Sequence, residues 1–157
     1  MSPVRFSFPR LALISLLGWV FVSCSSTSVF QLSADEQNLL QQAMNTPLTF
    51  VVPRDQTIAS WDRVTDFVDR YSTMKLRSVT DSLVTTYEQP AVTPTIEAAS
   101  SIRYGYTVRR SKDPDGIRYS VQCTPSSTVG QKDADQNAHL GAYYIETGTV
   151  CDRCIVR

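Results

Sequence analysis

The stretch of sequence that decides the fold is residues 102–124, IRYGYTVRRSKDPDGIRYSVQCT. On both sides of its central pentapeptide KDPDG, residues 112–116, apolar residues alternate with polar ones, which is the pattern of a strand with one buried and one solvated face. The proline and glycine of the pentapeptide supply the fixed and permissive backbone angles of a tight reversal. The sequence therefore predicts a long antiparallel hairpin from residues 102–109 and 117–124.

A second and shorter hairpin is predicted upstream. Residues 74–79 and 83–88 have the composition of strands, and the polar cluster at residues 80–82 is typical of a turn. Still further upstream, a run of apolar and β-branched residues at 48–52 lies between two prolines, and it fits either a short edge strand or an extended connector.

Helical periodicity flanks these strands. Apolar residues recur every three or four positions between residues 58 and 71, which predicts an amphipathic helix. A final helix is predicted over residues 133–147, with Gly148 as its C-terminal cap. The capping-box pattern SADE at residues 33–36 predicts a short helix over residues 34–44.

Together these elements predict an α+β fold. An antiparallel four-stranded sheet with two helices packed on one face would bury the apolar sides of all of them at once. The short N-terminal helix would precede this arrangement, and the whole domain would span residues 33–157. A single domain of this length can bury roughly two thirds of the surface that its unfolded chain exposes.

The N-terminus has the composition of an export signal. Arg5 and Arg10 precede an apolar run at residues 11–22, which is shorter than the ~20 residues that a membrane-spanning helix needs. The run closes with the residues FVSC at positions 21–24, and this ending resembles the lipobox of bacterial lipoproteins. In that family the cysteine is lipidated and becomes the first residue of the mature protein.

The resemblance implies a signal peptide at residues 1–23, lipidation of Cys24, and a flexible tether at residues 24–32. Cleavage of an ordinary secretory signal near residues 23–26 is the alternative. Serine rather than aspartate follows the cysteine, as in lipoproteins that are passed on to the outer membrane. We therefore expect a cell-envelope protein that is anchored by lipid to the outer membrane and faces the periplasm.

Charge and histidine content argue against several functions. Without its first 23 residues the chain has 13 basic and 15 acidic residues, a net charge of −2, so we expect no nucleic-acid partner. His139 is the only histidine, and no activated serine motif accompanies it. We accordingly expect neither an enzyme nor a bound cofactor.

Three cysteines besides Cys24 are candidates for a disulfide, namely Cys123, Cys151 and Cys154. A C-x-x-C pair can serve as a structural disulfide, as a redox disulfide or as half of a metal site, and zinc would need His139 as its fourth ligand. The pair follows a helix instead of starting one, and the chain has no second C-x-x-C motif. We therefore favour a structural disulfide that joins Cys123 to Cys151 or Cys154, and we expect no metal.

The polar face of the long hairpin carries Arg103, Arg109 and Arg118. A turn centred on Pro114 and Asp115 is expected to place Arg109 opposite Arg118, and opposed like charges destabilise a sheet unless an anion lies between them. The three arginines are thus candidates for a face that binds an anionic partner. The alternative is that their side chains simply spread into water.

Several short sequences add a further resemblance. They are WDRV at residues 61–64 with Phe67 on one helix, TTY at residues 85–87, and the NA that opens the last helix at residue 137. With the order of elements over residues 54–148, they resemble the helix-grip domains of the BamC-type lipoprotein of the outer-membrane β-barrel assembly machine. Such domains are adaptor modules without catalytic residues.

The resemblance implies a lipid-anchored binding or adaptor module that contacts another envelope protein. The alternative is a periplasmic thiol-redox or metal-binding protein that uses Cys123, Cys151 and Cys154.

Overall fold

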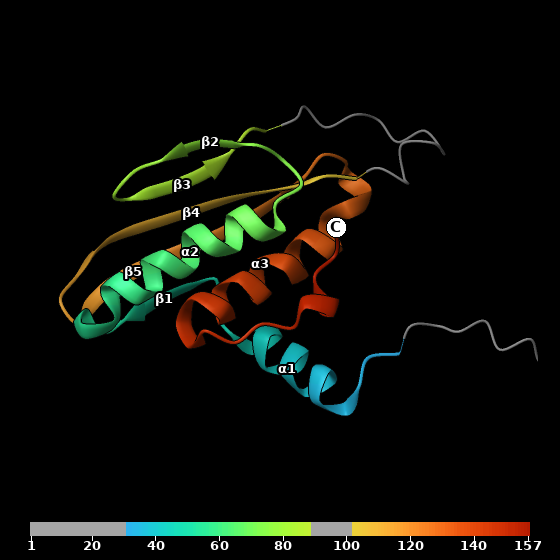
Figure 1. Cartoon of the computed structure of the whole chain (residues 1–157), viewed down its shortest axis with the longest axis horizontal. Coiled ribbons are helices and arrows are strands. Elements are labelled where there is room, and N and C mark those ends of the chain that lie inside the picture. The colour runs from blue at the N-terminus through green and yellow to red at the C-terminus, as the bar shows by residue number, and fades with distance from the viewer. Residues whose placement is uncertain (1–30, 89–101) are drawn as a thin grey trace, which may run out of the picture. The chain divides into compact units, whose positions relative to one another are not determined.

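The computed structural model describes residues 31–88 and 102–157, which contain three α-helices and five strands. In chain order these are α1 (Ala34–Asn45), β1 (Thr49–Val52), α2 (Thr57–Tyr71), β2 (Leu76–Val79), β3 (Leu83–Thr86), β4 (Tyr104–Asp113), β5 (Gly116–Pro125) and α3 (Gln131–Thr147) (Figure 1). The predicted α+β class with an antiparallel sheet is confirmed. The predicted signal peptide and Cys24 lie outside the described residues, as does the tether up to residue 30.

All five strands form one antiparallel sheet in the order β1-β5-β4-β3-β2. The prediction of four strands was wrong, because the run at residues 48–52 is an edge strand and not a connector. β1 pairs with β5 from Thr49 opposite Ser120 to Val52 opposite Ile117. It thereby covers main-chain groups that a bare edge of β5 would leave open to pairing with another chain.

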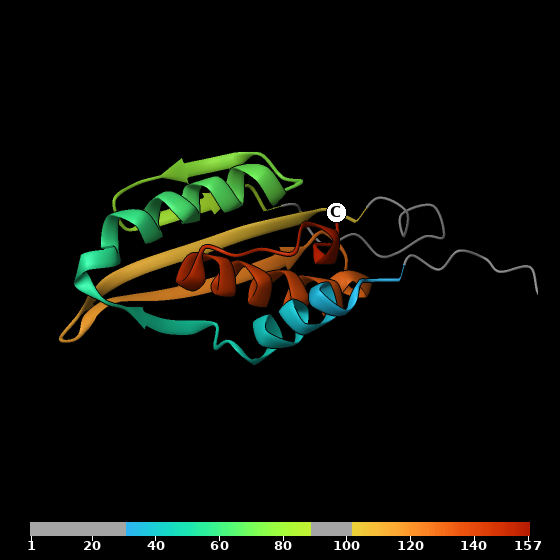
Figure 2. The same ribbon diagram turned by 60° about the horizontal axis from the view of Figure 1, so that its bottom comes forward.

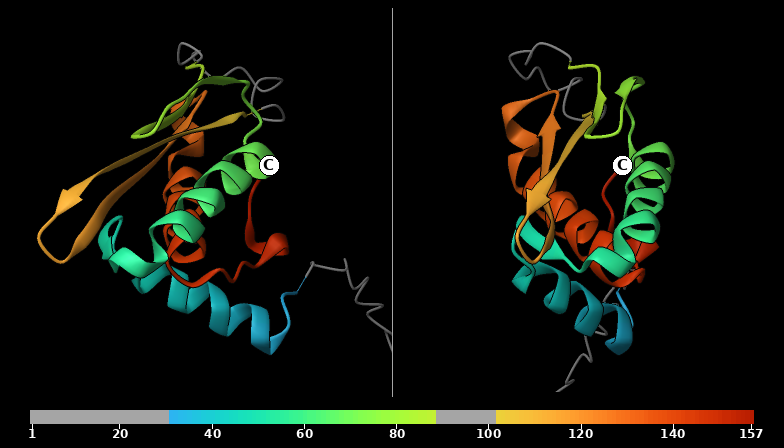
Figure 3. Two further views of the ribbon diagram at one scale, coloured as in Figure 1. Left: turned by 60° about the vertical axis from the view of Figure 1, so that its left-hand side comes forward. Right: turned by 90° about the vertical axis from the view of Figure 1, so that its left-hand side faces the viewer.

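The helices α2 and α3 both pack against one face of the sheet, here called the inner face (Figures 2 and 3). Phe67 of α2 meets Tyr106 of β4 edge to face, with ring centroids 5.3 Å apart. Gly141 lets α3 approach this pair, because a Cβ atom at that position would lie 2.8 Å from the Phe67 ring. The two helices and the sheet thus share one aromatic core.

The helix ends follow the local sequence closely. Ser33 and Glu36 form the predicted capping box at the start of α1, each side chain bonding the main chain of the other residue. Gly148 ends α3 in the left-handed conformation at φ 80°, where glycine carries no steric penalty. None of the helices in the described ranges has the length and apolar character needed to cross a membrane.

The opposite face of the sheet, here called the outer face, carries no helix among the described residues (Figure 3). Along β4 and β5 it presents Thr107, Arg109, Ser111, Arg118, Ser120 and Gln122. The candidate site on this face is therefore open to a partner.

Candidate functional site

The register of the long hairpin differs from the predicted one. Arg109 lies opposite Ser120, and Arg118 lies opposite Ser111. The predicted pairing of Arg109 with Arg118 was wrong, because the turn holds only two residues, which shifts the register by two positions. Both arginines still lie on the outer face, as diagonal neighbours within reach of long side chains.

Arg118 is held in place by an acidic neighbour. Its guanidinium forms an ion pair with Asp113, whose side chain is only 7% exposed, while the Arg118 side chain is 51% exposed. The main-chain N–H of Asp115 donates a second bond to Asp113. That bond, followed by the Arg118 contact, lowers the pKa of Asp113, so the carboxylate remains charged at neutral pH.

Arg110 is fixed in another way. Its guanidinium carbon lies 4.0 Å from the centroid of the Trp61 ring, and its Nε donates to the main-chain carbonyl oxygen of Asp81. Trp61 was expected to lie in the core, but it is half-buried and its ring carries this cation. A guanidinium stacked on an indole loses mobility and keeps its remaining N–H groups free for other acceptors.

A groove of about 480 Å³ lies among these side chains. Its lining consists of Ser82, Leu83, Arg109, Arg110, Ser111, Arg118, Tyr119 and Ser120. This lining, here called the arginine groove, has three guanidinium groups and three serine hydroxyls but no carboxylate. Within the described ranges no acidic side chain pairs with Arg109. Such a lining suits a carboxylate or a phosphate, which accept charge-assisted hydrogen bonds from arginine.

Arg103 lies apart from this groove. It precedes β4, six positions before Arg109, and it lines a separate hollow with Lys75 and Tyr87. The predicted face of three arginines is therefore divided, since only Arg109 and Arg118 come together. Arg110 joins them although its place in the alternation assigned it to the opposite face, and only its contact with Trp61 reveals its position.

The cysteines pair differently from the favoured prediction. The disulfide joins Cys151 to Cys154, and Cys123 is a buried free thiol. A bond from Cys123 to either of them was the wrong prediction, because its side chain points from the inner face of β5 into the core. The other two are close enough to bond to each other across the single short turn of Asp152–Cys154.

The Cys123 thiol lies opposite Tyr106 in the sheet. Burial raises the pKa of Cys123 to about 12 and raises the pKa of the Tyr106 hydroxyl as well. A thiol with such a pKa holds almost no thiolate at neutral pH, and thiolate is the form that attacks disulfides and binds metals. Cys123 is accordingly a core residue in chemical terms.

The zinc alternative lacks its ligand set. No group of three or more histidine, cysteine or acidic side chains could hold a metal ion in residues 31–88 and 102–157. His139 is not near the sulfurs as a fourth ligand would be, because its Nδ1 lies 2.8 Å from the carbonyl oxygen of Thr46 at the end of α1. It links the end of α1 to α3.

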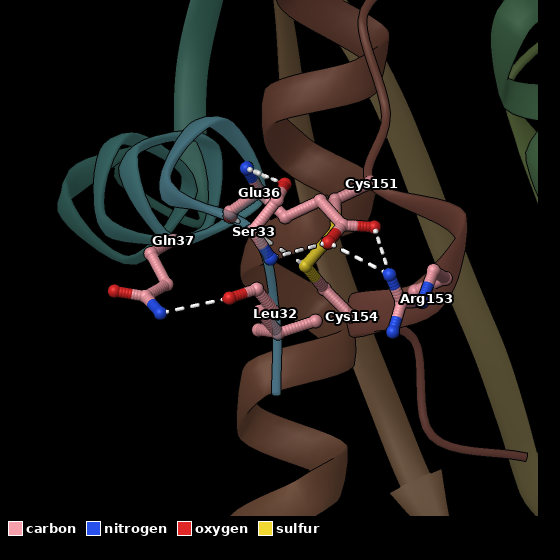
Figure 4. Close-up of polar contacts among 7 residues, drawn as sticks. All are labelled: Leu32, Ser33, Glu36, Gln37, Cys151, Arg153 and Cys154. Carbon is pink, nitrogen blue, oxygen red and sulfur yellow. Dashed lines mark hydrogen bonds and ion pairs between the residues drawn. A yellow bond between two sulfur atoms is a disulfide. The ribbon is translucent and has the colours of Figure 1, made fainter. Parts of the chain in front are cut away.

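The disulfide turn packs against the start of α1 (Figure 4). Arg153 forms an ion pair of 3.1 Å with Glu36, the residue that completes the capping box. The sulfur of Cys154 lies 3.7 Å from the main-chain oxygen of Glu36. The hydrogen bond from the Ser33 N–H lowers the pKa of Glu36 first, and Arg153 lowers it further. One carboxylate thus serves both the helix cap and the disulfide turn.

No family model, no curated protein and no solved structure matches this chain.

Proposed function

We propose that this protein is a lipid-anchored lipoprotein of the cell envelope that acts as a non-enzymatic binding or adaptor module. The observation that carries the proposal is the arginine groove on a sheet face without covering helices in the described part of the chain. Two of its guanidinium groups are held by neighbours and the third, that of Arg109, can bind an anionic group of a partner. The partner is therefore another envelope protein with exposed carboxylates or phosphates.

The fold supports the adaptor function by analogy. The four strands β2 to β5 with α2 and α3 on their inner face have the order of elements that prompted the resemblance to helix-grip adaptor domains. The added strand β1 extends the sheet beyond β5. Anchoring at Cys24 by a short tether would keep the domain close to the outer membrane and to partners there.

Anchoring has a test of its own. Cys24→Ala should move the protein from the detergent phase to the aqueous phase of a detergent separation, because the lipid supplies most of the membrane affinity. Continued partition of the variant with detergent would contradict lipidation at Cys24.

Partner binding is tested by affinity capture from crosslinked membranes. The double variant Arg109→Gln/Arg118→Gln should capture at least tenfold less of the partner, and its residual capture should depend less on salt. Arg103→Gln is the matched control, because it removes one arginine from the same side of the sheet but outside the groove. Equal loss in the control and the double variant would contradict a site in the groove.

A further inference from the structure

The segment after α3, residues 149–157, is here called the tail. It begins beyond Gly148, passes through the disulfide turn, and returns between the end of α2 and α3 (Figures 1 and 3). Ile155 is 7% exposed and its backbone is extended, at φ −80° and ψ 125°. The tail therefore has the form of a short peptide bound between two helices.

Both helical residues that grip the tail bind its main chain. The side-chain amide of Asn137 donates from Nδ2 to the carbonyl oxygen of Val156 at 2.8 Å and accepts from the N–H of Val156 at 3.0 Å. Gln136 donates from Nε2 to the carbonyl oxygen of Cys154 at 2.7 Å. Main-chain hydrogen bonds are the part of peptide recognition that does not depend on the sequence of the peptide.

Two side chains of the tail add selectivity. Ile155 is part of the apolar core, and the guanidinium carbon of Arg157 lies 5.1 Å from the centroid of the Tyr71 ring. The Tyr71 hydroxyl also donates to the carboxylate of Asp152. The surface formed by Tyr71, Gln136 and Asn137, here called the tail seat, thus favours an aliphatic residue followed two positions later by a cation.

The buried amide of Asn137 shows what the tail seat requires. This residue is 0% exposed, and both polar atoms of its side chain bond to Val156. An empty seat would leave a buried donor and a buried acceptor without partners, which costs more than the bonds contribute when formed. An apolar side chain would fill the same space without that cost, so the amide is suited to hold a peptide group.

We propose that the tail seat is a peptide-recognition site and that the tail is an internal ligand, which an extended segment of a partner protein replaces. The partner segment carries an aliphatic residue in the place of Ile155 and a basic residue in the place of Arg157. This inference goes beyond the proposed function, because the tail seat belongs to the helices and the arginine groove to the outer face of the sheet.

The tail is held near its seat by a second set of contacts. The disulfide turn is tied to α1 through Arg153 and Glu36, and α3 connects directly to the tail. This attachment gives the tail a high effective concentration at its seat, so a free peptide competes poorly with it. A test therefore needs a full chain with a weakened tail and an intact seat.

Ile155→Asp in the full chain meets this need, because it removes the buried aliphatic contact and leaves Tyr71, Gln136 and Asn137 unchanged. The probe is a fluorescent peptide of residues 149–157 with serine in place of both cysteines, and binding is measured by fluorescence anisotropy. We expect the variant to bind the probe at least tenfold more tightly than the wild-type chain does. A second probe with proline in the place of Val156 lacks the N–H that Asn137 accepts, and it should bind at least tenfold more weakly.

Cys151→Ser/Cys154→Ser provides a second chain, which loosens the turn but keeps Ile155. Circular dichroism shows whether each variant folds. Folded variants that bind neither probe, or bind both equally, would overturn the proposal. Unfolding of both variants would also overturn it, because the tail would then be an integral part of the core. A dimer that forms without any probe would point to exchange of tails between two copies and would exclude the proposed partner segment.

Discussion

The two faces of the sheet have opposite surroundings although the same strands supply both. On the inner face Tyr104, Tyr106 and Tyr119 are at most 2% exposed and pack against helices. On the outer face Arg109 and Arg118 are exposed and line a groove. The comparison teaches that the fold depends on one face, so the other can carry recognition groups that contribute little to stability.

The largest expected effect separates the faces directly. Tyr106→Ala removes a ring packed against Phe67 and should lower the free energy of unfolding by about 3–5 kcal/mol. Gln122→Ala, on the outer face of β5, should change it by no more than about 0.5 kcal/mol. Urea unfolding monitored by circular dichroism measures both values. Similar losses in the two variants would mean that the outer face is also packed.

The contrast between the faces was predictable because a period of two residues assigns each side chain to one face without any knowledge of the partners. The capping box at Ser33 and the glycine cap at Gly148 were predictable for the same reason, since their contacts are local. Contacts between distant segments were not predictable. The strand at residues 48–52 depends on pairing with β5, and the stacking of Arg110 on Trp61 depends on how α2 crosses the sheet.

Register and disulfide pairing failed for a related reason. A change of one residue on each side of the hairpin turn decides whether Arg109 faces Arg118 or Ser120. The direction of the Cys123 side chain decides whether it can reach the tail, and the count of cysteines contains no such information. Motif spacing therefore identified the residues of the candidate site but not their mutual arrangement.

An intermediate effect concerns Cys123, which has its side chain on the inner face. Its pKa is about 12 in the folded chain and 9.0 as an ordinary thiol, so the unfolded chain loses this proton first as pH rises. The stabilising contribution is complete below pH 9 and is lost between pH 9 and 12. From pH 7 to pH 10 the wild-type chain should lose about 1 kcal/mol more stability than Cys123→Ala. Urea unfolding at the two pH values measures this difference.

Parallel loss of stability in both proteins would indicate that the thiol already meets water. Reaction with a thiol reagent offers a control, because a buried thiol should react only when the chain unfolds. Ser120, on the outer face of the same strand, provides the matched comparison. A cysteine introduced there by Ser120→Cys should react at once in the folded protein.

The smallest expected effects belong to the outer arginines. Arg109→Gln should change the free energy of unfolding by no more than about 0.5 kcal/mol, because no acidic side chain in the described ranges pairs with it. Arg118→Gln removes the ion pair with Asp113 and should cost slightly more at neutral pH. The pKa of Asp113 is lowered in the folded chain, so its stabilising contribution is present above its ordinary value and is lost as pH falls through the lowered one.

The extra cost of Arg118→Gln over Arg109→Gln should therefore disappear in acid, where Asp113 is protonated. Thermal unfolding of the two variants at pH 7 and pH 3 checks this. A large loss at pH 7 in either variant would show that the arginine is packed into the fold, and the groove would then be structural. Small losses in stability together with weakened capture of the partner would assign the two faces their separate roles, because only recognition would have been removed.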